Sequence, residues 1–159
     1  MCFFLRVIDN TLIVREGRHF CKITILEDRS VKYKALHNLE KMLKGDFVAN
    51  REYVVSKQGD RITFMNLHKH NDVSDMFCDK KIVDLCLFEN NLFLLHHSSL
   101  TVFDLKKKSS KEHSLQLSSG SKPVSVEVNE NAVVILDSCN DLHVFSLPGR
   151  KTVFKSQIL

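Results

Sequence analysis

Three side chains near the middle of the chain, His68, His70 and Cys78, belong to residue types that bind zinc. A structural zinc site uses four such ligands, usually in closely spaced pairs. Here a single His-x-His is followed eight residues later by one cysteine. The stretch from Leu67 to Lys80 is polar, which is typical of a surface loop between two β-rich units. We therefore expect solvated histidines in this stretch and no metal-binding residues.

Nucleophilic, acid–base and phosphate-binding chemistry has no matching pattern in this sequence. His96 and His97 stand at the predicted end of a strand, and no motif places an Asp or Ser partner beside them. The five glycines are dispersed, so no glycine-rich loop is present to hold a phosphate, and the GxSxG nucleophile motif is absent. We expect hydrogen-bonded or solvated histidines, no catalytic or cofactor-binding residues, and no enzyme activity.

The strongest basic cluster consists of Lys106, Lys107, Lys108 and Lys111. We expect it on the turn after a strand at 100–105, where the lysines are either simply solvated or in contact with RNA phosphates. Phosphate contacts of this kind do not depend on base sequence and weaken with salt. No aromatic residue stands among these lysines, so base stacking has no support.

The elements that carry these residues repeat along the chain. Four segments begin with a turn containing Asn or an acidic residue and continue as an apolar run of β-forming residues: Asp9–Val14, Asn50–Val55, Asn90–Leu95 and Glu130–Ile135. A second such run follows each of them and ends at Leu26, Leu67, Leu105 or Leu147. Equivalent positions in both runs recur every 38 to 42 residues. Two independent sets of equivalent positions with the same spacing indicate an internal repeat.

Each repeat also has a strand-like run before and after this pair. Val83–Leu87 and Val124–Val128 precede the third and fourth pairs, and His113–Leu117 and Thr152–Phe154 follow them. Four strands in about 40 residues are typical of a β-propeller blade. The sequence therefore predicts an all-β, single-domain fold over 1–159, with four blades at approximately 1–35, 44–78, 81–118 and 122–159.

The predicted blades contain apolar and polar segments with distinct expected roles. Ser109-Ser110 and Ser118–Ser121 flank the predicted strand at 113–117, and we interpret them as flexible turns. We expect the core between packed sheets to contain Leu85, Leu87, Leu92, Leu94, Val102, Val126, Val128, Ile135 and Val144.

The second repeat is the least regular. Its leading part places Leu36, Leu39, Met42 and Leu43 at helical spacing, with Gly45 as a candidate C-cap. Either a short helix lies between the first two blades, within Tyr33–Gly45, or the leading strand is only Asp46–Ala49. We favour the helical insertion.

The run Leu100–Leu105, Leu-Thr-Val-Phe-Asp-Leu, resembles the end of a WD repeat, with Phe103 in the place of the usual Trp and Asp104 in the place of the Asp. Phe145 and Ser146 occupy these places in the fourth repeat. The resemblance to a degenerate WD-repeat family implies a β-propeller scaffold. The Gly-His pair that usually precedes the first strand is missing in all four repeats, so the resemblance does not extend to the His–Asp hydrogen-bond network of regular WD blades.

A narrower resemblance covers residues 99–159. This part of the chain is similar in order and spacing to the non-catalytic WD-repeat subunit of tRNA guanine-N7 methyltransferase. The similarity covers the lysine-rich turn, Lys122-Pro123, the strand that follows and the segment Val133–Phe145. Leu136, Ser138, Asn140 and His143 depart from that family's pattern. The resemblance implies a scaffold for tRNA processing that stabilises a catalytic partner and helps to hold tRNA, with Lys106, Lys107, Lys108 and Lys111 as candidate RNA contacts.

Charge and cysteine usage limit the cellular setting. The net charge of +4 is below the strongly basic balance of dedicated nucleic-acid-binding domains. The five cysteines are scattered and odd in number, which favours reduced thiols inside the cell. No apolar stretch approaches 18 residues. We expect a protein of the nucleus or cytoplasm that binds a protein partner, binds no cofactor and does not enter a membrane.

The length of 159 residues holds four blades, whereas ordinary WD propellers have about seven. The first predicted strand begins one blade and the last completes another, so we expect an incomplete or partner-completed propeller. A closed four-bladed propeller with ligand-binding or hydrolase activity in its central channel is the alternative, and a two-sheet sandwich is a third. An enzyme site in the central channel needs polar residues at equivalent positions of the blades. The equivalent positions here are occupied by Leu12, Tyr53, Leu92 and Val133, which argues against such a site.

Overall fold

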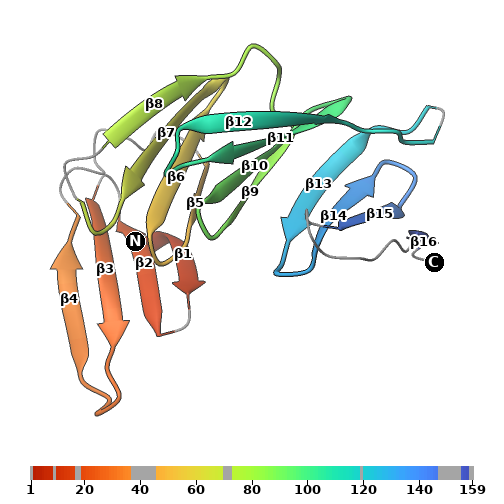
Figure 1. Ribbon diagram of the computed structural model, residues 1–159. Helices are drawn as coiled ribbons and strands as arrows, with labels where there is room; N and C mark the ends of the chain where they lie inside the picture. The colour runs from red at the N-terminus through yellow and green to blue at the C-terminus, as the bar shows by residue number, and fades with distance from the viewer. Residues whose placement is uncertain are drawn as a thin grey trace. The chain divides into compact units, whose positions relative to one another are not determined.

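The computed structural model of the chain describes residues 2–8, 10–16, 19–36, 46–69, 73–118, 120–146 and 155–157. All regular secondary structure in these residues is β strand, arranged as four antiparallel sheets of four strands each (Figure 1). The chain divides into two compact units, residues 1–78 and 79–159, with two sheets in each. The described residues include no helix of the length and hydropathy needed to cross a membrane.

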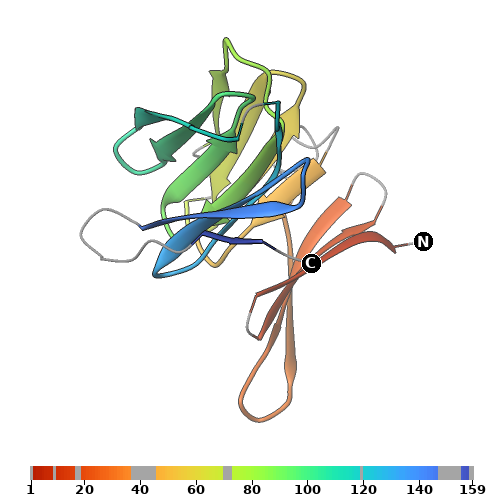
Figure 2. The same ribbon diagram turned by 90° about the vertical axis from the view of Figure 1, so that its right-hand side faces the viewer.

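The first unit contains sheets 1 and 2, each a simple meander of consecutive strands. Sheet 1 consists of β1 (Cys2–Ile8), β2 (Thr11–Glu16), β3 (His19–Ile25) and β4 (Val31–Ala35). Its β3–β4 hairpin extends beyond the ends of the neighbouring strands β1 and β2 (Figures 1 and 2). Sheet 2 consists of β5 (Asp46–Ala49), β6 (Tyr53–Gln58), β7 (Arg61–Asn66) and β8 (Val73–Phe77).

The second unit contains sheets 3 and 4 in the same meander order. Sheet 3 consists of β9 (Asp84–Phe88), β10 (Asn91–Leu95), β11 (Ser99–Asp104) and β12 (Ser109–Ser114). Sheet 4 consists of β13 (Pro123–Val128), β14 (Ala132–Asp137), β15 (Asp141–Ser146) and β16 (Lys155–Gln157). The four-strand repeat predicted from the sequence is confirmed.

Short polar side chains form the turns of the repeat. The side-chain oxygens of Asn50 and Asn129 accept hydrogen bonds from the backbone N–H groups two and three residues later, just before β6 and β14. Asn66 and Asp104 make the same pair of bonds after β7 and β11. These are Asx-type turns, in which the side chain replaces a backbone acceptor and reverses the chain. The repeated Asn and Asp residues of the sequence therefore set the ends of the strands.

Each unit has a core formed between the facing sides of its two sheets. In the first unit Ile13 of β2 packs with residues of sheet 2, and the cluster also contains Leu36, Phe47, Val54, Met65 and Leu67. In the second unit the cluster contains Phe93, Leu95, Leu100, Val126, Val133 and Ile135. Burial of each large side chain contributes roughly 1.5–3 kcal/mol. The predicted core residues Leu92, Leu94, Val126 and Ile135 are buried, and Leu85, Leu87, Val102, Val128 and Val144 are half-buried.

Two strand predictions were wrong, both at the outermost strand of a sheet. The polar stretch 67–80 is not entirely loop, because it contains β8, whose Asp75 is bonded to Arg61 and Thr63 of β7. The last strand of sheet 3 begins at Ser109, so Ser109-Ser110 is strand rather than turn. Both strands lie at sheet edges. The residues of β12 are polar and mostly exposed, and β8 exposes its apolar residues Val73 and Phe77, so neither strand has the buried apolar face that the prediction used.

The predicted helical insertion is not tested by the described residues. Tyr33–Ala35 belongs to β4, and Asp46–Ala49 forms the leading strand β5. Residues 37–45 of the predicted helix lie outside the described residues. The predicted strand Thr152–Phe154 also lies outside them, and β16 is found immediately afterwards at Lys155–Gln157.

Candidate functional site

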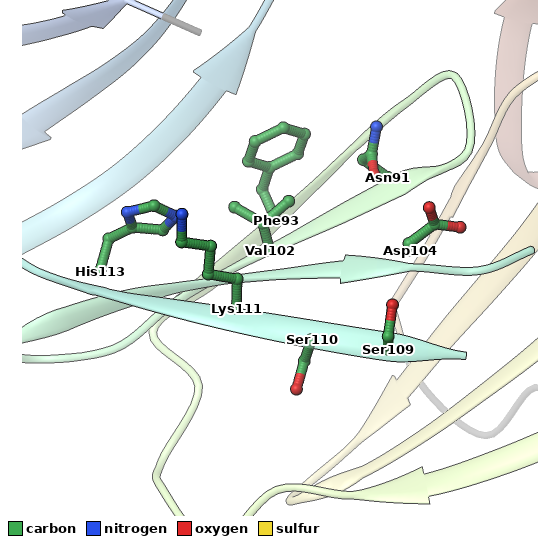
Figure 3. Close-up of a pocket in the computed structure, with 8 residues that line it drawn as sticks. All are labelled: Asn91, Phe93, Val102, Asp104, Ser109, Ser110, Lys111 and His113. Atoms are coloured by element: carbon green, nitrogen blue, oxygen red, sulfur yellow. The ribbon is translucent and has the colours of Figure 1, made fainter. Parts of the chain in front are cut away.

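A pocket of about 290 Å³ lies on sheet 3, over strands β10, β11 and β12 (Figure 3). Its apolar part comes from Phe93 and Val102, which are direct cross-strand partners, and Lys111 is the next residue in the same row. Phe93 is 2% exposed and belongs to the core of the unit. The other lining residues are polar: Asn91, Asp104, Ser109, Ser110 and His113. The pocket therefore combines an apolar floor with a polar rim.

The four lysines predicted as a basic cluster are close in sequence but occupy two kinds of position. Lys106, Lys107 and Lys108 form the exposed turn between β11 and β12, and the Lys107 Nζ lies 3.8 Å from Asp104 Oδ2. Lys111 lies within β12 and lines the pocket, so the prediction that it belongs to the turn was wrong. Because β12 begins earlier than predicted, Lys111 lies within the strand as the cross-strand partner of Val102, and its side chain is still exposed.

The predicted metal-ligand types are placed as follows. His68 is exposed in the turn after β7, Cys78 is partly buried after β8, and His70 lies outside the described residues. Among the described residues, no three His, Cys, Asp or Glu side chains are close enough together to hold a metal ion.

His96 and His97 differ in environment, as the sequence allowed. His96 is buried, with Nδ1 3.1 Å from the Lys81 carbonyl oxygen and Nε2 3.1 Å from Thr101 Oγ1. The carbonyl can only accept, so Nδ1 donates to it and Nε2 accepts from the threonine hydroxyl. His97 is exposed. The expectation of hydrogen-bonded or solvated histidines is confirmed at this pair.

A buried aspartate–histidine pair in sheet 4 was missed by the sequence analysis. Asp137 Oδ2 accepts hydrogen bonds from His143 Nε2 and Ser121 Oγ, both at 2.8 Å. Its Oδ1 accepts from the backbone N–H groups of Cys139 and Asp141. The hydrogen bond from His143 is the largest of the causes that hold the pKa of Asp137 well below its ordinary value. Asp137 is therefore a buried carboxylate that fixes the β14–β15 turn.

Equivalent positions in the third strand of three sheets carry similar polar contacts. Thr63, Thr101 and His143 occupy the same register position in β7, β11 and β15. Their side chains bond Asp75, His96 and Asp137, respectively. The sequence contains a signal for these contacts, because a hydrogen-bonding side chain recurs at the same position in the middle of an otherwise apolar strand. These polar groups hold neighbouring strands and turns together, which is a structural role.

Sheets 3 and 4 are joined by polar contacts between their first strands. Asp84 Oδ2 of β9 accepts a hydrogen bond of 2.9 Å from the backbone N–H of Val126 in β13. Beside it, Cys86 Sγ lies 4.0 Å from Glu127 Oε2. Burial and, to a smaller extent, the nearby Glu127 carboxylate raise the pKa of the Cys86 thiol to about 11. This thiol is protonated at neutral pH and is a poor nucleophile.

Sheet 1 carries an exposed apolar patch, formed by Ile25, Leu26, Val31 and Tyr33. Ile25 and Val31 are cross-strand partners, and Tyr33 lies on the same face of β4. Their exposed fractions are 43% for Ile25, 64% for Val31 and 67% for Tyr33. Leu26, in the turn that follows β3, is 43% exposed. The opposite face of sheet 1 is the one that packs against sheet 2, through Ile13.

Comparison with known proteins shows likeness in structure alone. No family model and no curated protein matches the sequence. The apo structure of AztD from Citrobacter koseri matches with a TM-score of 0.71 and 12% sequence identity, over 99% of this chain and 47% of AztD. Hsv2p from Kluyveromyces lactis matches with a TM-score of 0.62 and 10% identity, over 92% of this chain and 49% of that protein.

The N-terminal domain of Nup159 also matches, with a TM-score of 0.58 and 11% identity, over 94% of this chain and 42% of that chain. The chain thus spans about half the length of the solved structures that it resembles. These structures are β-propellers. Their likeness and the four four-stranded meanders together show that this chain has a β-propeller fold with four blades, which are sheets 1 to 4.

Proposed function

We propose that this chain is a non-catalytic β-propeller scaffold that binds a protein partner through the apolar patch of sheet 1. The observation that carries the proposal is the exposure of Ile25, Val31 and Tyr33 on one face of the β3–β4 hairpin. Contiguous exposed apolar side chains of this kind mark interaction sites on soluble proteins. Burial of the patch by a partner removes this apolar area from water and stabilises the complex.

The partner surface that suits this patch is another β-sheet face. In a propeller each blade packs on its neighbours through its two faces, and sheet 1 uses the Ile13 face against sheet 2. A partner that supplies an apolar sheet face to Ile25 and Val31 would give sheet 1 the second neighbour that a blade normally has. We therefore propose that the partner completes the propeller next to sheet 1.

The polar clusters support a role without catalysis. Both carboxylate oxygens of Asp137 are occupied by donors that hold a turn, and both ring nitrogens of His96 are hydrogen-bonded. These hydrogen bonds hold strands and turns together. This structural role supports the proposal of a binding function.

The sequence alone supports a more specific proposal for the partner and the cellular setting. The resemblance over residues 99–159 makes the catalytic subunit of a tRNA guanine-N7 methyltransferase the first partner to test, with tRNA contacted by Lys106, Lys107, Lys108 and Lys111. The scattered cysteines favour reduced thiols, which supports the proposal that the protein acts in the nucleus or cytoplasm. These remain predictions, and co-expression with that subunit followed by a tRNA gel-shift assay tests them.

The proposal is tested by cross-linking from the patch itself. A photo-reactive amino acid placed at Val31 is expected to cross-link one defined protein in cells, whereas the same group at Lys32, on the opposite face of β4, cross-links it far less. The captured protein is then purified for direct binding measurements. Equal cross-linking from both positions, or none from Val31, would contradict the proposal.

A further inference from the structure

We propose that β12 and the adjoining pocket of sheet 3 bind an extended acidic peptide, which adds to the sheet as a fifth strand and extends one large apolar side chain over β12 toward Val102. This inference deepens the proposed function, because it names the chemistry of a segment that the protein partner would present. The apolar patch and this site belong to different units, so each can be altered without the other.

The first observation is the position of β12. It is the outermost strand of sheet 3 and pairs only with β11 among the described strands. Its residues are exposed except for His113, which is half-buried. An edge strand of this kind presents N–H and C=O groups that are not used within the sheet, and these groups can pair with an extended segment of another chain.

The second observation is the pocket beside this edge. Ser109, Lys111 and His113 alternate along β12 on the side that faces the pocket, and Val102 and Phe93 continue the Lys111 row across the sheet. A volume of about 290 Å³ is at the lower limit for small-molecule sites, which occupy roughly 300–1,000 Å³. The pocket is therefore suited to a single apolar side chain from a peptide held at the edge.

The third observation is the charge around the pocket. Lys111 lies at its rim, and Lys106 and Lys107 extend from the turn that leads into β12. The carboxylate of Asp104 caps this turn and lies near the Lys107 ammonium group, so it offsets only part of the positive charge. Glu112 points to the other face of the sheet and is paired with Lys80. The charge that remains favours Asp and Glu side chains in the bound strand.

The same features disfavour pairing with a second copy and stacking of single-stranded RNA, whereas tRNA phosphates would compete with the peptide for the same lysines. Lysines on an edge strand repel the lysines of a second copy, so edge-to-edge pairing between two copies is opposed. Single-stranded RNA is held mainly by stacking of its bases on exposed aromatic rings. The exposed aromatic side chains among the described residues, Tyr33 and Phe77, both belong to the first unit.

The test is selection of a phage-displayed random decapeptide library on the purified full chain. Peptides recovered on the wild-type protein are expected to be enriched severalfold in Asp and Glu around one large apolar residue. A synthetic peptide of the recovered sequence then serves as the fluorescent probe for affinity. Reversal of charge in Lys111→Glu is expected to weaken its binding at least about tenfold, and Ser109→Phe, which fills the pocket, is expected to do the same without changing charge.

The matched control is Lys32→Glu, which reverses the charge of an exposed lysine on the outer strand of sheet 1 and should leave peptide affinity unchanged. Circular dichroism of each variant shows that it is folded. Recovery of peptides without acidic enrichment, or equal loss in the control, overturns the inference. Tight binding of labelled tRNA that is lost in Lys111→Glu, with no acidic peptide selected, overturns it in favour of the tRNA contact. If no acidic peptide binds to sheet 3, the expected cross-linking from Val31 is unaffected. The two proposals can therefore be refuted independently.

Discussion

Asp137 shows how a single side chain organises one blade of this propeller. It accepts four hydrogen bonds: from a serine before β13, from two backbone N–H groups of the β14–β15 turn, and from His143 of β15. Bonds from several donors stabilise the charged form, and they account for the direction of its pKa shift. The charge of Asp137 is therefore part of what holds sheet 4 together.

We predict that Asp137 makes stability depend on pH in the acid range. A folded-state pKa below the unfolded value of about 3.9 contributes stability that is complete above that value and is lost as the pH falls through the folded-state pKa. Asp137→Asn should lower the thermal midpoint by several degrees at pH 7 and flatten its decline below about pH 4. Parallel thermal melts of both proteins from pH 7 to pH 2 measure this. Identical pH profiles would show that Asp137 does not carry the effect.

We predict that Cys86 is slow to alkylate. Its pKa of about 11 keeps the thiolate rare at pH 8, whereas Cys139 is exposed in the β14–β15 turn. Iodoacetamide at pH 8 should label Cys139 much faster than Cys86, and labelling of Cys86 should rise steeply only as the pH approaches its pKa. Peptide mass spectrometry over a time course gives both rates. Comparable alkylation rates of the two cysteines at pH 8 would contradict the burial of the Cys86 thiol on β9.

The first strands of sheets 3 and 4 are linked by the side chain of Asp84, which accepts the backbone N–H of Val126. We predict that Asp84→Ala destabilises the second unit by about 1.5–3 kcal/mol, which is typical of a hydrogen bond to a charged group. The amide hydrogen of Val126 should then exchange faster, whereas Asp79→Ala, at an exposed position before β9, should leave it unchanged. Hydrogen exchange followed by NMR measures this amide directly. Unaltered exchange in Asp84→Ala would show that the two strands do not depend on this bond.

The strands that the sequence predicts well are those with buried apolar faces. β10, β11 and β14 were found within one or two residues, because runs such as Leu92–Leu95 must pack on both sides. The edge strands β8 and β12 were missed or misplaced because their polar residues are stabilised by pairing with β7 and β11, which a local pattern does not contain. The register of β12 is also what brings Lys111 to the pocket, so that site could not be predicted.

The polar network illustrates the same limit. The missing Gly-His pair argued against a His–Asp network, yet His143 and Asp137 form a buried pair in sheet 4. The histidine comes from the third strand instead of from the segment before the first strand. Which two side chains meet is decided by strand register, since Ile135 lies opposite His143 and places it beside the turn of Asp137. Residue types alone do not carry that information.

The whole chain combines two compact units of the same plan, each with a core between two facing sheets. The β3–β4 hairpin exposes apolar side chains to water. This exposure is the reason why we propose a scaffold whose patch is covered by a partner. The acidic-peptide site on sheet 3 would add a second, charge-dependent contact to the same partner.

The most direct test of this account is the affinity of the partner captured from Val31 for two matched double variants. Ile25→Ser with Val31→Ser alters one cross-strand pair of the patch, and Thr24→Ser with Lys32→Ser alters the adjacent pair on the opposite face. Both are expected to keep the fold, because these side chains are half-buried or exposed. The account predicts that the patch variant binds at least about tenfold more weakly, since two apolar side chains lose their burial, while the control variant binds like the wild type. Equal affinities of the two variants would contradict it.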